Sequence, residues 1–283
     1  RMGESISWSE SSAVVYTNSV LGARDNREGG QSSFASGLTG RTPYYGLHIP
    51  ENRRGQVLVK ILDKPKGYSE YSAVGAYVGK KIVEKIPVFE GFDPPSNEEL
   101  ATLGAALACT GGVAMFHAVG YTPEAPTREA AFQGAPYETI EITRREIREG
   151  FQTATRAKSR EVDLVLLGCP QLTIHQVRYV AEKLAGRKVK EGTSLWLQTN
   201  AFVKGMAKQL GYLDIIERAG GLVLQDMCTC LSYPELLGHK TMACNSTKVS
   251  FYTLGSNGMD IWCGDTDKCI ETAITGVFAD EEI

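Results

Sequence analysis

The chain has 283 residues, of which 42% are hydrophobic and 22% are charged, which is typical of a globular protein of one large or two moderate domains. Its 30 basic and 33 acidic residues give a formal net charge of −3, which argues against a broad basic surface that binds nucleic acid or an anionic membrane. Glycine accounts for 30 residues, about 11% against a usual ~7%, and predicts many tight turns or close backbone contacts.

The first half of the chain has a weak pattern of elements. Residues 10–31 have only a short apolar run at their start, and after this run we expect a loop that presents polar groups. Residues 56–62 are predicted to form a strand and residues 71–83 a helix. The proline-rich residues 87–95 are predicted to form a connection.

A helix with a clear start signal follows this connection. Ser96 and Glu99 have the spacing of a capping box, so we expect a helix over residues 97–109. The uncharged residues 100–120 are long enough to span a membrane, but they are rich in alanine and glycine and are interrupted by a glycine pair. We therefore expect a buried helix with a tight turn in this segment and no membrane span.

Strands and helices alternate regularly in the second half. Strands are predicted over residues 161–168, 194–200, 221–227, 240–244 and 260–263. Helices are predicted over residues 173–184, 202–210, 214–219 and 266–275. This alternation indicates an α/β fold in which a parallel sheet carries helices on both faces. We place a domain boundary within residues 155–160, which gives regions 1–157 and 158–283.

Reactive or polar residues directly follow several of these strands. They are Cys169, Asn200, Cys228, Asn245 and Ser246, and Cys230 lies two residues beyond Cys228. Ligands collect beyond the carboxyl ends of the strands in open parallel sheets, so these side chains are expected to share one edge. For Cys169 and Cys228, a metal-ligand or reactive role and a role as buried core residues both remain open.

The seven cysteines are an odd number in a large chain without a secretory leader, which indicates reduced thiols in a cytoplasmic protein. Cys244, Cys263 and Cys269 lie within apolar runs and are predicted to belong to the core. The absence of a Cys-x-x-Cys pair disfavours a zinc ribbon or a thioredoxin-like site. Because the chain begins with Arg1 instead of methionine, we expect it to be a fragment or a processed product.

Other catalytic motifs are absent from the sequence. His48, His117, His175 and His239 have no metal-binding spacing; we expect His117 to lie in the core and His175 on the surface. No GxSxG, HExxH, Walker or GxGxxG motif occurs, which disfavours ordinary hydrolases, P-loop enzymes and dinucleotide-binding proteins.

A polar loop over residues 18–30 is a candidate anion-binding segment. It contains Asn18, Arg24, Asn26 and Arg27, whose amides and guanidinium groups can bind a carboxylate or phosphate through paired hydrogen bonds. A solvated surface loop is the alternative. The residues therefore indicate an α/β protein with a candidate thiol-ligated metal centre and an anion-binding loop, but they define no reaction.

Six long segments of the chain resemble the aconitase X family, and they occur in the family's order. They are WSESSAVVYTNSVLGARDNREGG (8–30), GRTPYYGLH (40–48), GGVAMFHAVGYTPEAP (111–126), DLVLLGCPQL (163–172), GYLDIIERAGGLVLQDMC (211–228) and KTMACNSTK (240–248). The resemblance implies an aconitase-like fold and a hydro-lyase of the aconitase superfamily. The activities of this family include dehydration of cis-3-hydroxy-L-proline, our first expectation, and of mevalonate 5-phosphate, the alternative.

The resemblance also implies a cysteine-held iron centre, either an iron–sulfur cluster of undetermined type or a mononuclear iron. The matching ligands are Cys169 and Cys228. A third family cysteine belongs to a segment upstream of residue 3 that this chain lacks, together with the family's N-terminal helical region; Cys230 is a weaker substitute. A Ser-Ser-Gly-Ala run of many relatives is replaced here by Cys109-Thr110-Gly111-Gly112, which would place a thiol near the site without making it a ligand.

The family's small swivelling domain, which supplies a serine as catalytic base, is missing from the chain and is expected as a separate partner subunit. Iron would then act as a Lewis acid on the substrate hydroxyl while the partner's base removes the proton next to the carboxylate. Candidate residues for orienting the substrate are Asn18, Arg24, Asn26, Arg27, Asn245, Ser246 and Lys248. A non-catalytic remnant and a zinc-thiolate structural protein remain as alternatives from other classes.

Overall fold

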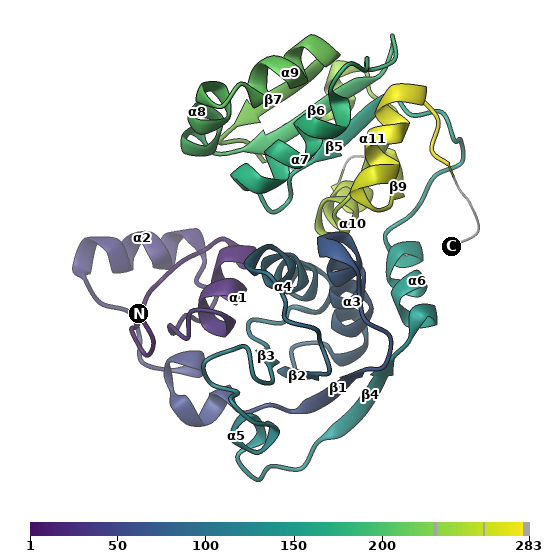
Figure 1. Ribbon diagram of the computed structural model, residues 1–283. Helices are drawn as coiled ribbons and strands as arrows, with labels where there is room; N and C mark the ends of the chain where they lie inside the picture. The colour runs from purple at the N-terminus through teal and green to yellow at the C-terminus, as the bar shows by residue number, and fades with distance from the viewer. Residues whose placement is uncertain (229–230, 257, 280–283) are drawn as a thin grey trace. The chain divides into compact units, whose positions relative to one another are not determined.

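The computed structural model describes residues 1–228, 231–256 and 258–279. The chain divides into two compact units between Gly150 and Phe151, and each unit has its own sheet (Figure 1). This division lies a few residues before the boundary expected after residue 157, and helix α6 (Arg144–Thr153) runs across it.

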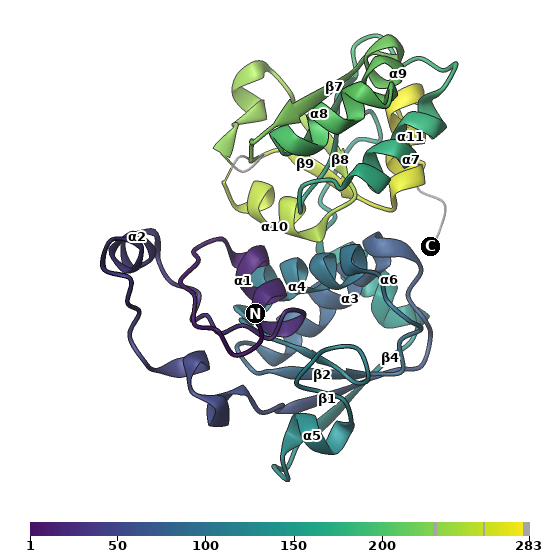
Figure 2. The ribbon, with the colours of Figure 1, turned by 60° about the vertical axis from the view of Figure 1, so that its left-hand side comes forward.

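Unit 1 is built on a four-stranded sheet in the order β3-β2-β1-β4, and all of its neighbouring strands are parallel. The strands are β1 (Val57–Ile61), β2 (Pro87–Glu90), β3 (His117–Ala118) and β4 (Glu138–Ile142). Helices cover one face of the sheet, and a short helix lies on the other (Figures 1 and 2). They are α1 (Ser11–Ser19), α3 (Gly67–Ile82) and α4 (Asn97–Gly111) on the first face and α5 (Arg128–Phe132) on the second. The other helical segments are α2 (Gly30–Thr39), η1 (Gly46–His48) and η2 (Pro50–Arg53).

Helices α3 and α4 approach each other at backbone distance through glycines. A Cβ atom added to Gly111 would lie 2.2 Å from the carbonyl oxygen of Gly79, and one added to Gly75 would lie 2.6 Å from that of Leu103. Side chains at these positions would force the helices apart, because the backbone of the partner helix cannot move aside alone. These close backbone contacts confirm one expectation drawn from the high glycine content.

The structure confirms the expected start and end of α4. The Ser96 hydroxyl accepts a hydrogen bond from the backbone N–H of Glu99, and the Glu99 carboxylate accepts one from the backbone N–H of Ser96. The helix ends before Gly112, which has a left-handed backbone with φ of 66°. Residues 100–120 therefore form a buried helix and a turn that leads into β3, as predicted. None of the helices in the described ranges combines the length and the apolar character that a membrane crossing requires.

The prediction of a loop within residues 10–31 was wrong in part, because α1 occupies residues 11–19 and α2 begins at Gly30. Helix α1 is rich in serine, threonine and valine, which have modest helix propensity. It is held by packing against α4, where a Cβ on Gly104 would lie 2.9 Å from Val15. Tertiary contact thus overrides a weak local preference.

Two strands of unit 1 were also missed. Strand β2 begins at Pro87, inside the segment predicted as a connection, because proline is tolerated as the first residue of a strand. Strand β4 lies at the edge of the sheet and most of its residues are exposed, so its sequence has no clear apolar pattern.

Unit 2 contains a five-stranded, fully parallel sheet in the order β7-β6-β5-β8-β9. The strands are β5 (Leu164–Leu167), β6 (Ser194–Thr199), β7 (Gly221–Gln225), β8 (Thr241–Cys244) and β9 (Asp260–Cys263). The helices are α7 (Ile174–Leu184), α8 (Ala201–Gln209), α9 (Tyr212–Ala219), α10 (Thr247–Ser256) and α11 (Thr266–Thr275), and a short turn η4 (Pro234–Leu237) precedes β8. All five predicted strands and all four predicted helices of this half are confirmed. So is the α/β class of parallel sheets with helices on their faces.

The core of unit 2 explains why its pattern could be recognised. Strand β5 is buried along its whole length, and its side chains pack with apolar residues of α7, α9 and α11. Strands covered on both faces have continuous apolar sequences, which are easier to identify than half-exposed ones.

His117 occupies the buried position that was expected of it. Only 2% of its surface is exposed, and its Nε2 lies 2.7 Å from the carbonyl oxygen of Arg53. Since a carbonyl only accepts, Nε2 carries a proton. Burial holds the pKa of His117 below its ordinary value, and burial has the same effect on the pKa of His48.

Replacing His117 with glutamine is expected to weaken the acid sensitivity of unit 1. The unfolded imidazole takes up a proton below about pH 6.5 whereas the folded one does so only at lower pH, so the stability of the wild type falls as the pH decreases below that value. Each such proton contributes a slope of about 1.4 kcal/mol per pH unit. Urea unfolding between pH 7 and 5.5 should show a shallower slope for His117→Gln. His175→Gln, which replaces an exposed imidazole, is the control and should keep the wild-type slope; equal slopes for all three proteins would contradict this account.

Candidate functional site

The direction of the chain across the sheet of unit 2 reverses between β5 and β8. From β5 the chain moves outward to β6 and β7 on one side, and then returns to β8 and β9 on the other side. In open parallel sheets, the crevice beyond the carboxyl ends of the strands at such a reversal is the usual position of a ligand. The segments at this position here follow Leu167 of β5 and Cys244 of β8.

Two cysteine-bearing loops lie next to each other at this edge. Gly168 must be glycine, since a Cβ there would lie 2.4 Å from the carbonyl oxygen of Gln198. Cys169 follows it and is half-buried, whereas Cys228 is exposed. The Nε2 of Gln171 donates a hydrogen bond of 3.5 Å to the carbonyl oxygen of Met227. This bond joins the loop after β5 to the loop after β7, so the thiols expected at one edge do lie in adjoining segments.

The polar residues after β8 lie at the same edge but are turned into the protein. Asn245 and Ser246 are almost completely buried, and Lys248 is 8% exposed. The Asn245 amide donates to the hydroxyl of Thr266 at 3.1 Å, and the Ser246 hydroxyl accepts from the backbone N–H of Val249 at 3.5 Å. Together these contacts hold the first turn of α10 against the start of α11.

Asn200, another residue at a strand end, caps a helix. Its side-chain oxygen accepts a hydrogen bond of 2.9 Å from the backbone N–H of Val203, in the first turn of α8. This capping contact explains the asparagine at the end of β6, so no ligand is needed to account for it.

The three cysteines predicted to belong to the core are buried. Cys244 and Cys263 are direct neighbours across β8 and β9, and Cys269 lies on α11. A hydrogen bond with Cys244, together with burial, raises the pKa of the Cys263 thiol, and burial raises that of Cys269. These thiols behave as small apolar side chains, as expected. Cys109 is also buried, and its thiol donates to the carbonyl oxygen of Ala106 on α4.

In the metal-free chain, an alkylating reagent should distinguish the two groups of thiols. Cys169 and Cys228 are expected to react in the folded protein at least about tenfold faster than Cys263 and Cys269, because the reagent needs an accessible thiolate. Peptide mass mapping of folded and urea-unfolded samples measures this ratio. Labelling of Cys263 in the folded protein at the rate of Cys228 would contradict the assignment.

The described part of unit 2 brings the loops of two thiols, Cys169 and Cys228, together at one edge of the sheet. Within residues 1–228, 231–256 and 258–279, no three His, Cys, Asp or Glu side chains come together in a way that could hold a metal ion. Cys230, the expected substitute ligand, lies outside the described residues. The donor set of Cys169 and Cys228 fits iron–sulfur or zinc chemistry, but two thiolates do not complete a ligand shell.

The polar loop belongs to unit 1, where most of its side chains hold the backbone in place. Asn18 is fully buried, and its amide donates to the carbonyl oxygens of Asp25 and Ala114. Arg24 donates to the carbonyl oxygen of His48 at 3.3 Å. All the polar atoms of the Asn18 side chain are used within the protein, since its oxygen accepts from two further donors.

Asn26 and Arg27 are the loop residues that line a pocket of about 490 Å³. Asn26 is held by the backbone of Tyr45 and Leu47, and one guanidinium nitrogen of Arg27 donates to the carbonyl oxygen of Gly112. Arg27 itself has a left-handed backbone with φ of 56°, which is uncommon outside glycine and often marks a functional site.

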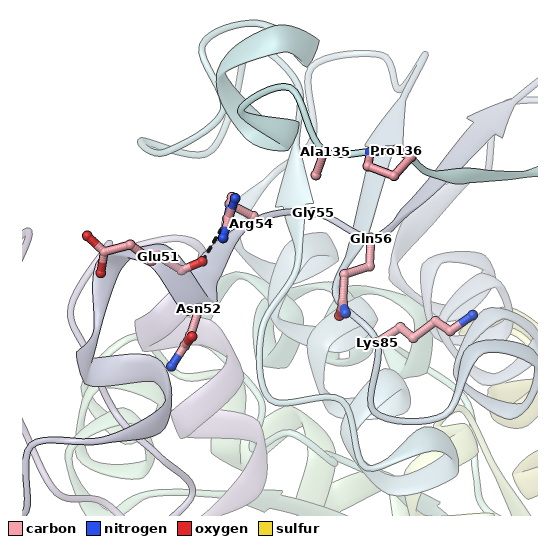
Figure 3. Close-up of a pocket in the computed structure, with 8 residues that line it drawn as sticks. All are labelled: Glu51, Asn52, Arg54, Gly55, Gln56, Lys85, Ala135 and Pro136. Atoms are coloured by element: carbon pink, nitrogen blue, oxygen red, sulfur yellow. Dashed lines mark hydrogen bonds between the residues drawn. The ribbon is translucent and has the colours of Figure 1, made fainter.

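A second pocket of about 530 Å³ adjoins the first and shares Asn52 and Gln56 with it. Arg54 and Lys85 line this second pocket. Figure 3 shows the Arg54 guanidinium donating to the carbonyl oxygen of Glu51, while the Glu51 carboxylate points away from Gln56 and Lys85.

Sequence reasoning missed several buried charged or titratable residues around the polar loop. Asp25 accepts hydrogen bonds from the backbone N–H groups of Trp8 and Arg27, yet burial raises its pKa above the ordinary value. Glu28 is also buried and accepts a hydrogen bond from the hydroxyl of Ser32. Arg53 is the largest fully buried side chain of the described residues. The run Asp-Asn-Arg-Glu at residues 25–28 was a local signal for the first two, but no pattern in the sequence marks the burial of Arg53.

Three models of successive family domains match almost the whole chain. They are described as the first, second and third domains of aconitase X and match residues 1–51, 55–152 and 162–275. The large subunits of phosphomevalonate dehydratase from Methanocaldococcus jannaschii and Thermococcus kodakarensis are 38% and 39% identical to the chain, which covers 68% and 69% of their lengths and aligns over 96% of its own. Cis-3-hydroxy-L-proline dehydratase from Pseudomonas aeruginosa is 32% identical over 98% of the chain and 49% of the relative.

A solved structure agrees with these matches. The crystal structure of Thermococcus kodakaraensis aconitase X (holo-form) superposes with a TM-score of 0.88 at 37% identity, over 96% of this chain and 69% of that one. The named dehydratase relatives assign the chain to the hydro-lyases. It belongs to the aconitase X family, which confirms the resemblance found in its sequence.

Proposed function

We propose that the chain is the large subunit of a hydro-lyase that removes water from a small hydroxy acid with the help of an iron centre. The observation that carries this proposal is the pair of cysteine-bearing loops at the carboxyl edge of β5 and β7, joined by the hydrogen bond from Gln171 to Met227. Thiols at such an edge suit a ligand-binding role better than a packing role.

Cys169 and Cys228 would provide two of the metal ligands, because thiolates favour iron–sulfur centres over hard cations. The remaining ligand would come from outside the described residues. An iron centre at this edge would supply a Lewis acid for the departure of the substrate hydroxyl.

The polar residues would bind and orient the substrate anion. Arg27 lines the first pocket of unit 1. Asn26 lines it too, and the backbone of Tyr45 and Leu47 holds its amide in place. A guanidinium binds a carboxylate through two parallel hydrogen bonds, which fixes the carbon that loses its proton. Arg24 would act with them. Asn18 has no polar atom left for a substrate, so we revise its role from substrate contact to support of the loop.

Asn245, Ser246 and Lys248 would act at the edge of unit 2, where the buried Lys248 adds a positive charge to the first turn of α10. Positive groups at this position favour an anionic substrate. A base on a small partner subunit would remove the proton next to the carboxylate, so that the carbon–oxygen bond breaks, water leaves and a double bond forms. The description of the relatives as large subunits supports such a partner.

For the substrate we favour mevalonate 5-phosphate over cis-3-hydroxy-L-proline, which reverses the order expected from sequence. Identity reaches 40% among phosphomevalonate relatives, which range down to 31%, and is 32–33% among hydroxyproline relatives. A substrate with two anionic groups also suits two adjoining pockets that each contain a cation. The first is lined by Arg27 and Glu84, and the second by Arg54, Lys85 and Glu51, whose carboxylate points away from Lys85. Lys85 forms an ion pair with Glu138 at 3.3 Å, so Arg54 would be the main cation of the second pocket.

Replacing Cys169 or Cys228 with alanine is expected to remove iron and to lower dehydration by at least about 100-fold, because the loss of a ligand affects the metal more than the loss of its outer hydrogen bonds, which already costs 10–100-fold. The measurement is iron content and turnover of both substrates with the complete protein and its small partner, purified without oxygen. Cys269→Ala, which removes a buried thiol of the core, is the matched control and should keep both. Zinc in place of iron would favour the zinc-thiolate alternative, and activity that survives both substitutions would contradict the metal mechanism.

A further inference from the structure

Arg53 is a buried cation to which the proposed mechanism gives no part. It lies at the end of η2 and only 1% of its surface is exposed. A fully buried arginine is rare unless its charge and all of its donors are satisfied. Its contacts therefore show what the fold requires of it.

All five N–H groups of the guanidinium donate to partners in unit 1. Nε and Nη2 contact the carboxylate of Glu124 at 2.6–3.0 Å. Nη1 contacts the side-chain oxygen of Asn18 at 3.2 Å and the carbonyl oxygen of Leu47 at 3.0 Å. Nη2 also contacts the carbonyl oxygens of Asn18 and Ala23 at 2.9 and 3.1 Å. The guanidinium thus holds both ends of the turn that precedes Arg24.

The same contacts continue to the pocket. Asn18 exchanges two hydrogen bonds of 2.9 Å with the backbone of Asp25. The carboxylate of Asp25 then accepts a hydrogen bond of 2.8 Å from the backbone N–H of Arg27, which has the uncommon left-handed conformation. On the other side, Leu47 accepts from Arg53 and donates its own N–H to Asn26 at 2.6 Å. Both pocket residues are therefore linked to one guanidinium group.

Arg53 is also fixed to the sheet through its backbone, because its carbonyl oxygen accepts the hydrogen bond from His117 on β3. Glu124 and this backbone contact hold Arg53 from two sides, so its guanidinium fixes the position of the loop. A lysine could not replace it, since an ammonium has three donors and no planar fork.

We infer that Arg53, held by Glu124, is a positioning residue that sets the orientation of Asn26 and Arg27 toward the substrate anion. This inference rests on the proposed function, because it assumes that the first pocket binds substrate. Arg53 itself contacts no substrate; it acts through Asn18, Asp25 and Leu47.

The test compares Arg53→Lys with the wild type, using the complete protein with its small partner and both candidate substrates. The variant is expected to raise the KM of the accepted substrate at least about tenfold and to change kcat less than about threefold, because misoriented donors weaken binding of the anion. Iron content should stay at the wild-type level, since the thiols belong to unit 2. Arg128→Lys is the matched control: Arg128 forms a similar two-pronged pair with Glu90 in unit 1, at 2.7–2.9 Å, without contact to the loop, and its KM should not change.

If the role of Arg53 is purely structural, Arg53→Lys will lower the unfolding midpoint but leave the KM of the folded enzyme unchanged. That result would overturn this inference and leave the proposed function standing. If Arg53→Lys does not fold, Glu124→Gln decides the question, because it keeps an acceptor for the fork while removing the charge that holds it. We expect its KM to rise about threefold, and an unchanged KM would overturn the inference. A wild-type complex that dehydrates neither substrate would overturn the proposed function, and the positioning role with it.

Discussion

The parallel arrangement of every strand is the constraint on which the rest of the structure depends. In a parallel sheet the carboxyl ends of all strands lie at the same edge. The sheet itself therefore brings together residues that are far apart in sequence. In unit 2 this brings the loop that contains Cys169 beside the loop that contains Cys228, which lies 59 residues further along the chain. The reversal of the chain between β5 and β8 adds the buried start of α10 to the same edge.

The polar loop of unit 1 reaches order by other means, because it has little apolar surface to bury. Hydrogen bonds from buried side chains take the place of a core there. Asn18 and Arg53 satisfy backbone carbonyl groups that would otherwise be buried without partners, and Asp25 satisfies backbone N–H groups. Such a network is stable only when every member is paired, which gives the loop a single conformation and leaves Arg27 and Asn26 to face the pocket.

The parts of the fold that could be predicted are those in which local pattern and burial agree. Strand β5 is a continuous apolar run that ends before Gly168, β6 ends before Asn200, and α4 carries a capping box at Ser96. Helix α1 could not be predicted because its stability comes from contact with α4. The strand-end positions of Cys169 and Cys228 could be predicted from the sequence, whereas their role as ligands was implied only by the family resemblance and stays a proposal. The inward direction of Asn18 and the burial of Arg53 could not be predicted, because a polar residue that supports a loop and one that binds a ligand look alike in sequence.

X-ray absorption at the iron edge tests the central claim most directly, since it reports which atoms surround the metal in the complete protein with its partner. Thiolate ligation from Cys169 and Cys228 predicts sulfur neighbours around the iron in the wild type and fewer of them in Cys169→Ser and Cys228→Ser, with Cys269→Ser unchanged. Iron surrounded only by oxygen and nitrogen in the wild type, or a sulfur shell that does not change in either variant, would contradict the account.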